Sequence, residues 1–431
     1  MTRRFARSGQ FGRRVAAAAL LVAVAGCGGG GGTPARSAPS GTDPKDVTGT
    51  VTVWLMNEAQ TSWPELVQQA NDEFAAKYPK VELKLSYQTW ADKIGKLDAA
   101  LKSGHAPDVV ELGNTETMKY ILNGSLAPVD RTTFENSDSW IRALASTCTY
   151  QDKLFCVPYY AGARVGIYNA AMFQDATGSA DFPQTEDALR TALDKIQAKH
   201  KGDKGFSALY LPGPYWYAAM SYVAAAGGAI ARFDGAGWWH GALNDPKSQA
   251  GIAHYIDLVK TYNHGDLTVN ELDQAAVLGK RQTALLYGNG WEAGAATAPL
   301  TGDPKLAADL RVTGMPGPDG KPLPSFIGSA GPAADWIRIF TSAKSEQVLA
   351  DKGTLPNNLT QLAPLRSNPA TAAAANAVPD AWFTPPAPGW SAVEKQNVLA
   401  GMLTDILRGK SVDAATKDAD AQIDKLINNP S

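Results

Sequence analysis

TVTVWLM (residues 50–56) begins the stretch that decides the fold, because strand and helix patterns alternate from there to residue 112. The segments that follow are SWPELVQQANDEFAAKYP (62–79), VELKLSY (81–87), ADKIGKLDAALKSG (91–104) and DVVEL (108–112). The first, third and fifth are β-branched, alternating or continuously apolar, which predicts strands, whereas the other two have apolar residues at helical spacing. Ser62 and Pro64 predict the N-cap and first turn of the first helix. The βαβαβ order is typical of a largely parallel sheet covered by helices.

Ligands of such sheets bind beyond the carboxyl ends of the strands. The side chains predicted at these ends are Asn57, Glu58, Trp90, Glu111, Asn114 and Thr115.

A second α/β set begins after Asn169. Its segments are FPQTEDALRTALDKIQAKHKG, a helix entered through Thr185, then FSALYL, KSQAGIAHYIDLVKTY and RQTALLYGNGW, which predict strand, helix and strand. Two α/β units joined by crossing segments predict a cleft between them, and the cleft is the expected site.

The N-terminus has the pattern of an export signal. Five arginines and no acid occur in the first fourteen residues, and the uncharged run 15–25 is too short to span a bilayer. VAGC (24–27) resembles a bacterial lipobox, which predicts lipidation of Cys27 after removal of residues 1–26; cleavage without lipidation is the alternative. The Gly-, Ser- and Pro-rich residues 27–48 predict a flexible tether. The export route, Sec or twin-arginine, stays open.

The other two cysteines lie in TCTYQDKLFCVPYY. Cys148 and Cys156 are placed symmetrically about the polar residues 151–153, which resemble a turn between two short strands. An exported chain meets an oxidising compartment, so we predict a disulfide between them, with two buried thiols as the alternative.

Charge excludes one class of partner. Removal of residues 1–26 takes away five arginines and no acid, which changes the formal net charge from −2 to −7. An acidic domain is poorly suited to binding nucleic acid.

The eleven tryptophans either build the core or offer flat apolar faces to a ligand.

Seven segments carry a resemblance to a known family. They are FAAKYPKVELKLSYQTW (74–90), SGHAPDVVELGNTETMKY (103–120), GSLAPVD (124–130), YYAGARVGIYNAAMF (159–173), VLGKRQTALLYGNGW (277–291), GSAGPAADW (328–336) and VLAGMLTDILRGKSVDAATKDADAQI (398–423). In this order they resemble extracellular solute-binding proteins of family 1, the maltose-binding type of bacterial ABC importers.

The resemblance implies a type II periplasmic-binding-protein-like fold: two α/β lobes, each a mainly parallel sheet flanked by helices, with a ligand cleft between them. It implies an N-terminal lobe of residues 49–160 and 326–345, a C-terminal lobe of 167–310 and 346–431, and hinge crossings at 161–166 and 311–325. It also implies a sugar or oligosaccharide ligand and delivery to the transmembrane subunits of an ABC permease.

The resemblance also implies a set of binding residues. In the family, polar side chains follow the first strand, and Asn57 and Glu58 occupy that place here. An aromatic pair opens a helix in the second lobe, which corresponds to Tyr215 and Trp216. The tryptophan after YGNG corresponds to Trp291. Trp390 heads the final helical region, and Glu292 completes the set. The sequence departs from the maltose type at Glu111, Asn114 and Thr115 and looks closer to actinobacterial proteins for xylo-, cello- or chito-oligosaccharides.

Several aromatic and basic residues have two readings. A sugar ring stacks its C–H face on an aromatic plane and bonds its hydroxyls to planar polar groups. The candidates for the cleft are therefore Trp90, Arg164 and one of the neighbours Trp238 and Trp239. Scaffold packing is the alternative for Trp90 and a hinge salt bridge for Arg164. Trp54, between Val53 and Leu55 on a strand, is assigned to the core. Trp63 and Trp140 are assigned to packing or surface positions, and Trp336 and Trp382 to the core or surface.

Other functions find less support in the sequence. The five histidines show no zinc spacing, and no nucleophile elbow or P-loop occurs. The adjacent Tyr159 and Tyr160 leave ferric-ion binding as an alternative; a glycosidase using Glu58 and Glu111 is less favoured. We therefore expect a monomeric, non-enzymatic protein without cofactor or metal. We expect it to be tethered by lipid to the outer face of the cell membrane and to capture a malto-, xylo-, cello- or chito-type sugar by hinge closure.

Overall fold

The computed structural model describes residues 43–429, except 270, 299–301, 332–334 and 379–380. These residues belong to one compact unit of the chain, 38–431. The predicted signal, Cys27 and most of the tether lie outside the described residues. The last tether residues form a short 3₁₀ turn, η1 (Pro44–Asp46), where Asp46 pairs with Lys80 at 2.9 Å.

The first sheet has the predicted parallel core. Strand β1 (Gly49–Met56) lies between β2 (Val81–Gln88) and β3 (Val109–Val110) and runs parallel to both. The alternating burial of β1 ends in the buried pair Leu55 and Met56, which fixes the carboxyl end of the strand in the core.

Helix α3 (Lys93–Ser103) ends as the sequence predicts, whereas α2 (Pro64–Lys77) begins differently from the prediction. Helix α3 ends at Gly104, whose φ of 73° closes the last turn. Helix α2 begins with Trp63 as its N-cap, so the prediction of Ser62 as N-cap is wrong. Ser62 instead ends the extra helix α1 (Asn57–Thr61), where its N–H donates to the Glu58 carbonyl at 2.8 Å.

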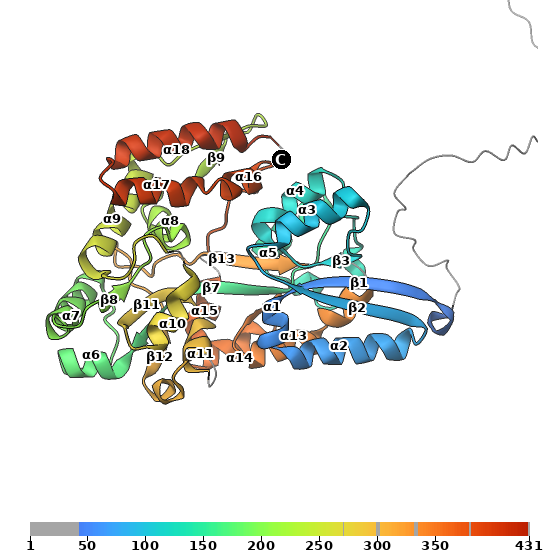
Figure 1. Ribbon diagram of the computed structural model, residues 1–431, viewed down its shortest axis with the longest axis horizontal. Helices are drawn as coiled ribbons and strands as arrows, with labels where there is room; N and C mark the ends of the chain where they lie inside the picture. Colours follow the sequence, from blue (N-terminus) through green and yellow to red (C-terminus); the bar gives the residue numbers. More distant parts are fainter. Residues whose placement is uncertain (1–42, 270, 299–301, 332–334, 379–380, 430–431) are drawn as a thin grey trace, which may run out of the picture. The chain divides into compact units, whose positions relative to one another are not determined.

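One strand belongs to both halves of the molecule. The first half of β7 (Tyr160–Asn169) pairs with β13 (Ile327–Gly331) on one side and β14 (Leu355–Pro356) on the other. Strand β13 also pairs with β4 (Leu112–Gly113), which continues β3 after a break at Glu111. The second half of β7 pairs with β11 (Thr283–Asn289) and β12 (Leu310–Thr313), and β11 runs parallel to β8 (Ser207–Tyr210). Strand β7 therefore links the two sheets (Figure 1).

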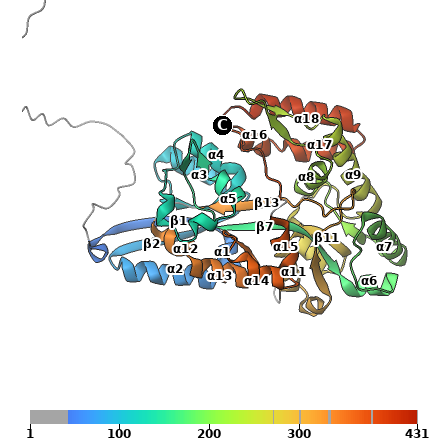
Figure 2. The ribbon, with the colours of Figure 1, turned by 180° about the vertical axis from the view of Figure 1, so that it is seen from behind.

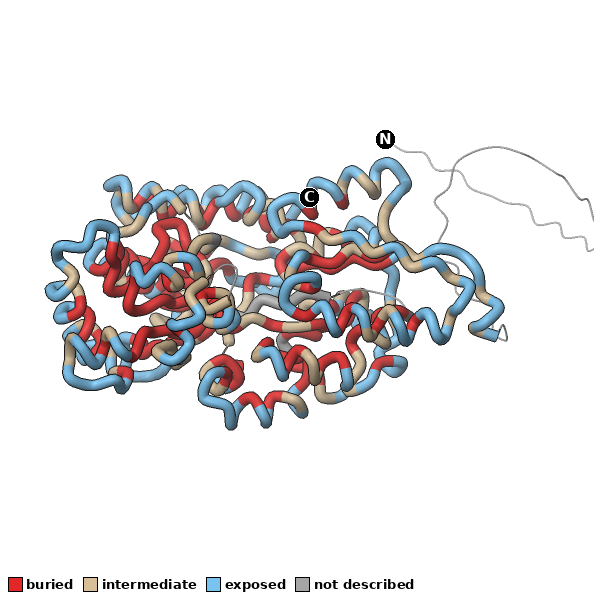
Figure 3. Tube along the Cα trace, turned by 60° about the horizontal axis from the view of Figure 1, so that its bottom comes forward, coloured by how far each residue is buried: buried red, intermediate tan, exposed pale blue. Residues whose placement is uncertain are grey.

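Helices cover each sheet, and we call the two halves the N-terminal and C-terminal lobes. In the N-terminal lobe these are α4 (Asn114–Leu122), α5 (Arg142–Thr147), α12 (Asp335–Phe340) and α13 (Ala343–Asp351), besides α1 to α3. In the C-terminal lobe they are α6 (Ala170–Thr177), α7 (Glu186–Lys199), α8 (Trp216–Ala225), α9 (Pro246–Tyr262), α10 (Gln274–Gly279), α11 (Glu292–Thr297), α16 (Trp390–Lys395), α17 (Val398–Leu407) and α18 (Val412–Leu426). Helices α14 (Leu362–Ser367) and α15 (Ala372–Ala377) pack beside β7 (Figure 2). The buried residues gather inside these layers (Figure 3).

The chain returns from the N-terminal to the C-terminal lobe later than the predicted boundary between residues 345 and 346. Residues 346–356 were assigned to the C-terminal lobe, yet α13 is tied to α2 by Lys344–Glu73 at 2.7 Å and Lys352–Glu65 at 2.6 Å. Strand β14 then pairs with Tyr160 and Ala161. The segment thus completes the N-terminal lobe, because its apolar face belongs to that core.

The predicted disulfide is present in the structure. Cys148 and Cys156 flank strands β5 (Thr149–Tyr150) and β6 (Lys153–Leu154), and their Cα atoms are 4.9 Å apart. The turn consists of Gln151 and Asp152, whose φ values of 48° and 61° match a two-residue hairpin turn.

Candidate ligand-binding site

Trp90 is held by two neighbours at the carboxyl edge of the first sheet. Its Nε1–H donates to Glu58 Oε1 at 2.9 Å, and the Lys93 ammonium lies 3.6 Å from the centroid of its ring. Lys93 is buried and pairs with Glu116 Oε2 at 2.7 Å. Trp90 nevertheless remains 41% exposed. The indole is therefore a fixed platform with accessible surface, which favours the cleft reading over scaffold packing.

Glu111 is buried at the same edge of the sheet. It interrupts the third strand, and its Oε2 accepts the Met56 N–H at 2.8 Å. Burial, assisted by the charge of Glu58, raises its pKa to about 7, while Lys93 opposes the rise. Glu111 Oε1 and Glu58 Oε2 are buried without hydrogen-bond partners among the described residues. Both are acceptors that no donor among the described residues satisfies.

Asn57 is exposed at the start of α1, one residue before Glu58. Asn114 and Thr115 begin α4 directly after β4. The expected convergence of the strand ends is thus observed, since all three ends lie at one edge of the sheet.

Arg164 on β7 is committed to the protein. Its Nε–H donates to the Tyr215 hydroxyl at 3.1 Å, and its Nη2 pairs with Glu271 at 2.7 Å. The guanidinium also lies 4.6 Å from the ring centroid of Tyr217. Arg164 therefore forms the hinge salt bridge that was the alternative to sugar binding.

The aromatic pair that opens α8 does not offer stacking faces in this structure. Tyr215 is fully buried and Trp216 is 6% exposed, because both side chains belong to the C-terminal core. The expectation that these two rings stack on a sugar is therefore corrected: Tyr215 positions Arg164, and Trp216 packs at 6.1 Å from Trp390.

Trp291 follows β11 and is 45% exposed. It lies against the crossing strand at Gly162, where an added Cβ would stand 3.9 Å from Trp291 Nε1 and 2.8 Å from Asn289 Oδ1. The absence of a side chain at Gly162 thus gives room to both residues.

Glu292 lies below Trp291 rather than in the open. It is 2% exposed and accepts hydrogen bonds from the Asn289 N–H at 3.3 Å and from Gln274 Nε2 at 3.2 Å. Burial, with the nearby charge of Glu271, raises its pKa to about 8.

Trp239 lies in a separate hairpin, β9 (Ala231–Phe233) and β10 (Trp239–Gly241). Asn428 bonds both its N–H and its carbonyl at 2.8 Å, and its ring packs on Phe233. Its neighbour Trp238 is 58% exposed. The structure does not bring either ring to the residues around Trp90 and Trp291.

The tyrosine pair divides between two environments. Neighbours on an extended chain point to opposite sides. Tyr159 is fully buried with its ring centroid 4.7 Å from that of Phe340, whereas Tyr160 is half-buried with its ring centroid 5.2 Å from that of Trp63. The remaining tryptophans also follow expectation: Trp63, Trp140 and Trp336 are buried in the N-terminal core, and Trp54 and Trp382 are half-buried.

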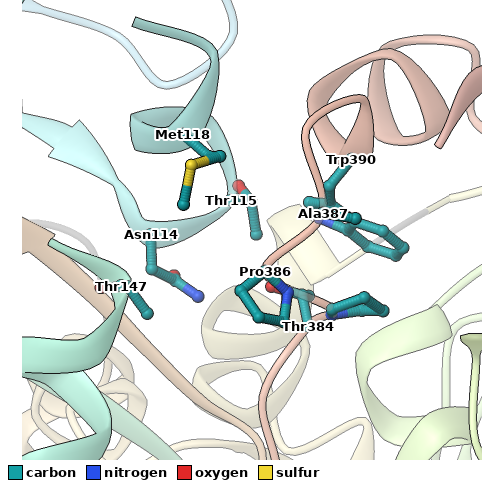
Figure 4. Close-up of a pocket in the computed structure, with 9 residues that line it drawn as sticks. Asn114, Thr115, Met118, Thr147, Thr384, Pro386, Ala387 and Trp390 are labelled. Carbon is teal, nitrogen blue, oxygen red and sulfur yellow. The ribbon is translucent and has the colours of Figure 1, made fainter. Parts of the chain in front are cut away.

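The two lobes face each other across a narrow pocket (Figure 4). The N-terminal lobe contributes Asn114, Thr115, Met118 and Thr147, and the C-terminal lobe contributes Thr384, Pro385, Pro386, Ala387 and Trp390. The enclosed space is about 20 Å³, room for one water molecule. A sugar ring enters here only when the lobes separate. Trp390 lines this pocket and is 1% exposed, because its side chain belongs to the C-terminal core.

Comparison with known proteins identifies the family. Residues 69–375 match the family described as bacterial extracellular solute-binding protein. The chain belongs to this family. Diacetylchitobiose binding protein DasA of Streptomyces coelicolor is 30% identical over 398 residues, which cover 88% of this solute-binding protein and 90% of DasA.

Solved structures share the fold of this solute-binding protein. The GacH receptor of Streptomyces glaucescens superimposes with a TM-score of 0.74 at 22% identity, covering 89% of this chain and all of GacH. The sugar-binding protein MalE of Xanthomonas citri gives 0.70 at 18% identity, covering 88% and 97%. The predicted family and the predicted two-lobed α/β fold are confirmed.

Three residues of this solute-binding protein, Tyr217, Glu394 and Lys93, were missed by sequence reasoning. The Tyr217 hydroxyl donates to Glu394 Oε1 at 2.9 Å, next to the pocket. A signal existed for Glu394, because it stands four residues after Trp390 and therefore on the same side of α16. Lys93, three residues after Trp90, carried no signal that set it apart from a surface lysine.

Proposed function

We propose that this protein captures a sugar or oligosaccharide between its lobes and delivers it to an ABC permease, without making or breaking bonds in the ligand. The observation that carries the proposal is the pair of exposed indoles, Trp90 in one lobe, beside the unpartnered oxygen of Glu58, and Trp291 in the other. Indole faces suit the C–H patches of a pyranose, and carboxylates accept from its hydroxyls.

Capture follows from differential affinity. A ligand that contacts both lobes favours the closed form over the open form by the free energy of the added contacts. Strand β7 links the lobes, and residues 161–166 and 311–325 remain our proposed hinge. The closed shape is then the form that a permease recognises.

The relatives narrow the ligand. DasA is named for diacetylchitobiose, and GacH was solved with acarbose. We infer an oligosaccharide of the chito, malto, xylo or cello type. The proteins compared are binding proteins, which supports a non-enzymatic role.

Tethering is the second part of the proposal. The family is extracellular, and among the described residues no helix is both long and apolar enough to cross a membrane. We propose that Cys27, lipidated after removal of residues 1–26, anchors the protein to the outer face of the cell membrane. Replacement of Cys27 by serine is expected to abolish incorporation of labelled palmitate and to release the protein into the medium.

A thermal-shift screen of the mature protein tests the function. Diacetylchitobiose and malto-, xylo- and cello-oligosaccharides form the panel, with ferric citrate as the comparison. A ligand at a hundredfold excess over Kd stabilises the fold by about 2.7 kcal/mol. A shift with ferric citrate alone contradicts the proposal, and chromatographic detection of sugar cleavage contradicts the non-enzymatic role.

A further inference from the structure

Lys93 is a buried cation at the edge of the first sheet. Its side chain is 1% exposed, and it pairs with Glu116 Oε2 at 2.7 Å. Burial of an ammonium group is costly, and apolar side chains of similar volume are often at least as stabilising as a buried ion pair. Stability alone therefore does not account for this pair, and its neighbour Trp90 indicates a role in the binding site.

The Trp90 indole is contacted on one face and at two opposite ends of its perimeter. The Lys93 ammonium covers one face, 3.6 Å from the ring centroid. At one end the indole Nε1–H donates to Glu58 Oε1 at 2.9 Å. At the other end Cζ3 lies against Gly113, where an added Cβ would stand 3.4 Å from it. Because 41% of Trp90 is exposed, the accessible surface is chiefly the face opposite Lys93. The platform is thus one-sided.

Glu116 extends this arrangement to helix α4. The same Oε2 that pairs with Lys93 also accepts the N–H of Gly113 at 2.9 Å. Gly113 is the N-cap of α4, whose first residues, Asn114 and Thr115, line the pocket between the lobes (Figure 4). One carboxylate oxygen therefore joins the cation behind the indole to the end of the helix that borders the pocket.

We propose that Lys93 and Glu116 are positioning residues for sugar capture, because their ion pair fixes the Trp90 indole and the start of α4 in one arrangement before the ligand arrives. The inference rests on the proposed function and adds to it the buried groups that set the stacking face. A platform that needs no ordering on binding retains its contact energy as affinity. Loss of the pair leaves the indole free to tilt, so affinity falls although the ring is still present.

A substitution that removes both charges separates positioning from stability. Lys93→Met keeps most of the side-chain volume, and Glu116→Gln keeps an amide oxygen that accepts the Gly113 N–H. The double variant leaves no buried charge without its partner, so we expect the melting temperature to stay close to that of the wild type. Affinity for diacetylchitobiose, and for each panel sugar that the wild type binds, should fall about five- to tenfold in calorimetric titration.

Indole N–H signals of the ¹⁵N-labelled, ligand-free mature protein report on the platform directly. The Trp90 signal is identified by its loss in Trp90→Phe. In the double variant we expect its Nε1–H to exchange with solvent about tenfold faster, because a tilting ring breaks the bond to Glu58. The Nε1–H of Trp336, bonded to Asn71 at 3.2 Å in the core, should exchange at the wild-type rate.

A matched control completes the test. Lys96→Met, at an exposed lysine three residues further along α3, should bind sugar and exchange its indole protons as the wild type does. Unchanged exchange of the Trp90 N–H in the double variant overturns the proposal, and so does a loss of affinity matched by a loss of melting temperature. The exchange measurement needs no sugar. A wild type that binds none of the panel sugars therefore contradicts the proposed function and leaves the positioning result readable.

Discussion

At the scale of the residue, surroundings rather than residue type decide what each tryptophan does. Trp90 is fixed by Glu58 and Lys93 yet keeps 41% of its surface exposed, while Trp336 is 1% exposed in the N-terminal core. A platform that is rigid before the ligand arrives loses little conformational freedom on binding, so its stacking energy is retained as affinity.

Trp291→Ala tests the stacking role of the exposed indole. Its ring is 45% exposed, so we expect sugar affinity to fall tenfold or more, about 1.4 kcal/mol, with the melting temperature nearly unchanged. Calorimetric titration and a melting curve measure the two effects. Trp336→Ala is the matched control: at 1% exposure in the N-terminal core it should lower the free energy of unfolding by about 3 to 5 kcal/mol. A comparable loss of stability in Trp291→Ala would assign that ring to the core.

Glu292 predicts a loss of stability at alkaline pH. Its folded pKa, about 8, lies above the ordinary value of 4.5, so the folded protein binds the proton more tightly than the unfolded chain. The resulting stabilisation is complete below pH 4.5 and is lost as the pH rises through 8. We expect the free energy of unfolding to decrease by about 2 kcal/mol between pH 6 and pH 8, measured by urea denaturation. Glu292→Gln should flatten this dependence; an identical slope in the variant would refute the assignment.

At the scale of the element, local patterns were sufficient where one segment determines its own structure. The alternation in β2, the glycine that ends α3 and the Thr185 cap of α7, which accepts from the Ala188 N–H, were all predicted. Ser62 was not, because α1 follows β1 without a loop and uses this residue for its own last turn. A capping residue between two helices serves either one, and sequence alone does not say which.

The β5–β6 hairpin predicts a measurable contribution from its disulfide. The bond closes a loop of nine residues, from Cys148 to Cys156, and closure of so short a loop restricts the unfolded chain by about 2 to 3 kcal/mol. The double variant Cys148→Ser/Cys156→Ser should lose this amount in chemical denaturation. Thiol titration of the non-reduced mature protein is the companion measurement, and two reactive thiols would contradict the bond.

At the scale of the whole molecule, the pairings that join the lobes could not be predicted from the sequence. Strand β7 pairs with β13 and β14, which lie more than 150 residues further along the chain, and no local pattern encodes such a distance. The same limit applies to the candidate site. The strand ends around Trp90 were predicted, whereas the burial of Tyr215 and the bond between Tyr217 and Glu394 depend on how distant segments pack.

The shared strand predicts that the lobes unfold together. Residues on both sides of β7 form one buried cluster, in which Ala161 and Ile167 from the two halves of the strand take part. Calorimetry of the mature protein should therefore show a single transition with equal calorimetric and van't Hoff enthalpies. Two resolved transitions would show that the lobes are independent.

The order in which the chain visits the two lobes also governs its synthesis. The N-terminal sheet lacks β13 and β14 until residue 356 has left the ribosome, and the other lobe waits for α18 near its end. Neither half completes its hydrogen-bonded layers early. A nascent chain therefore completes the packed layers of either lobe only late in its synthesis.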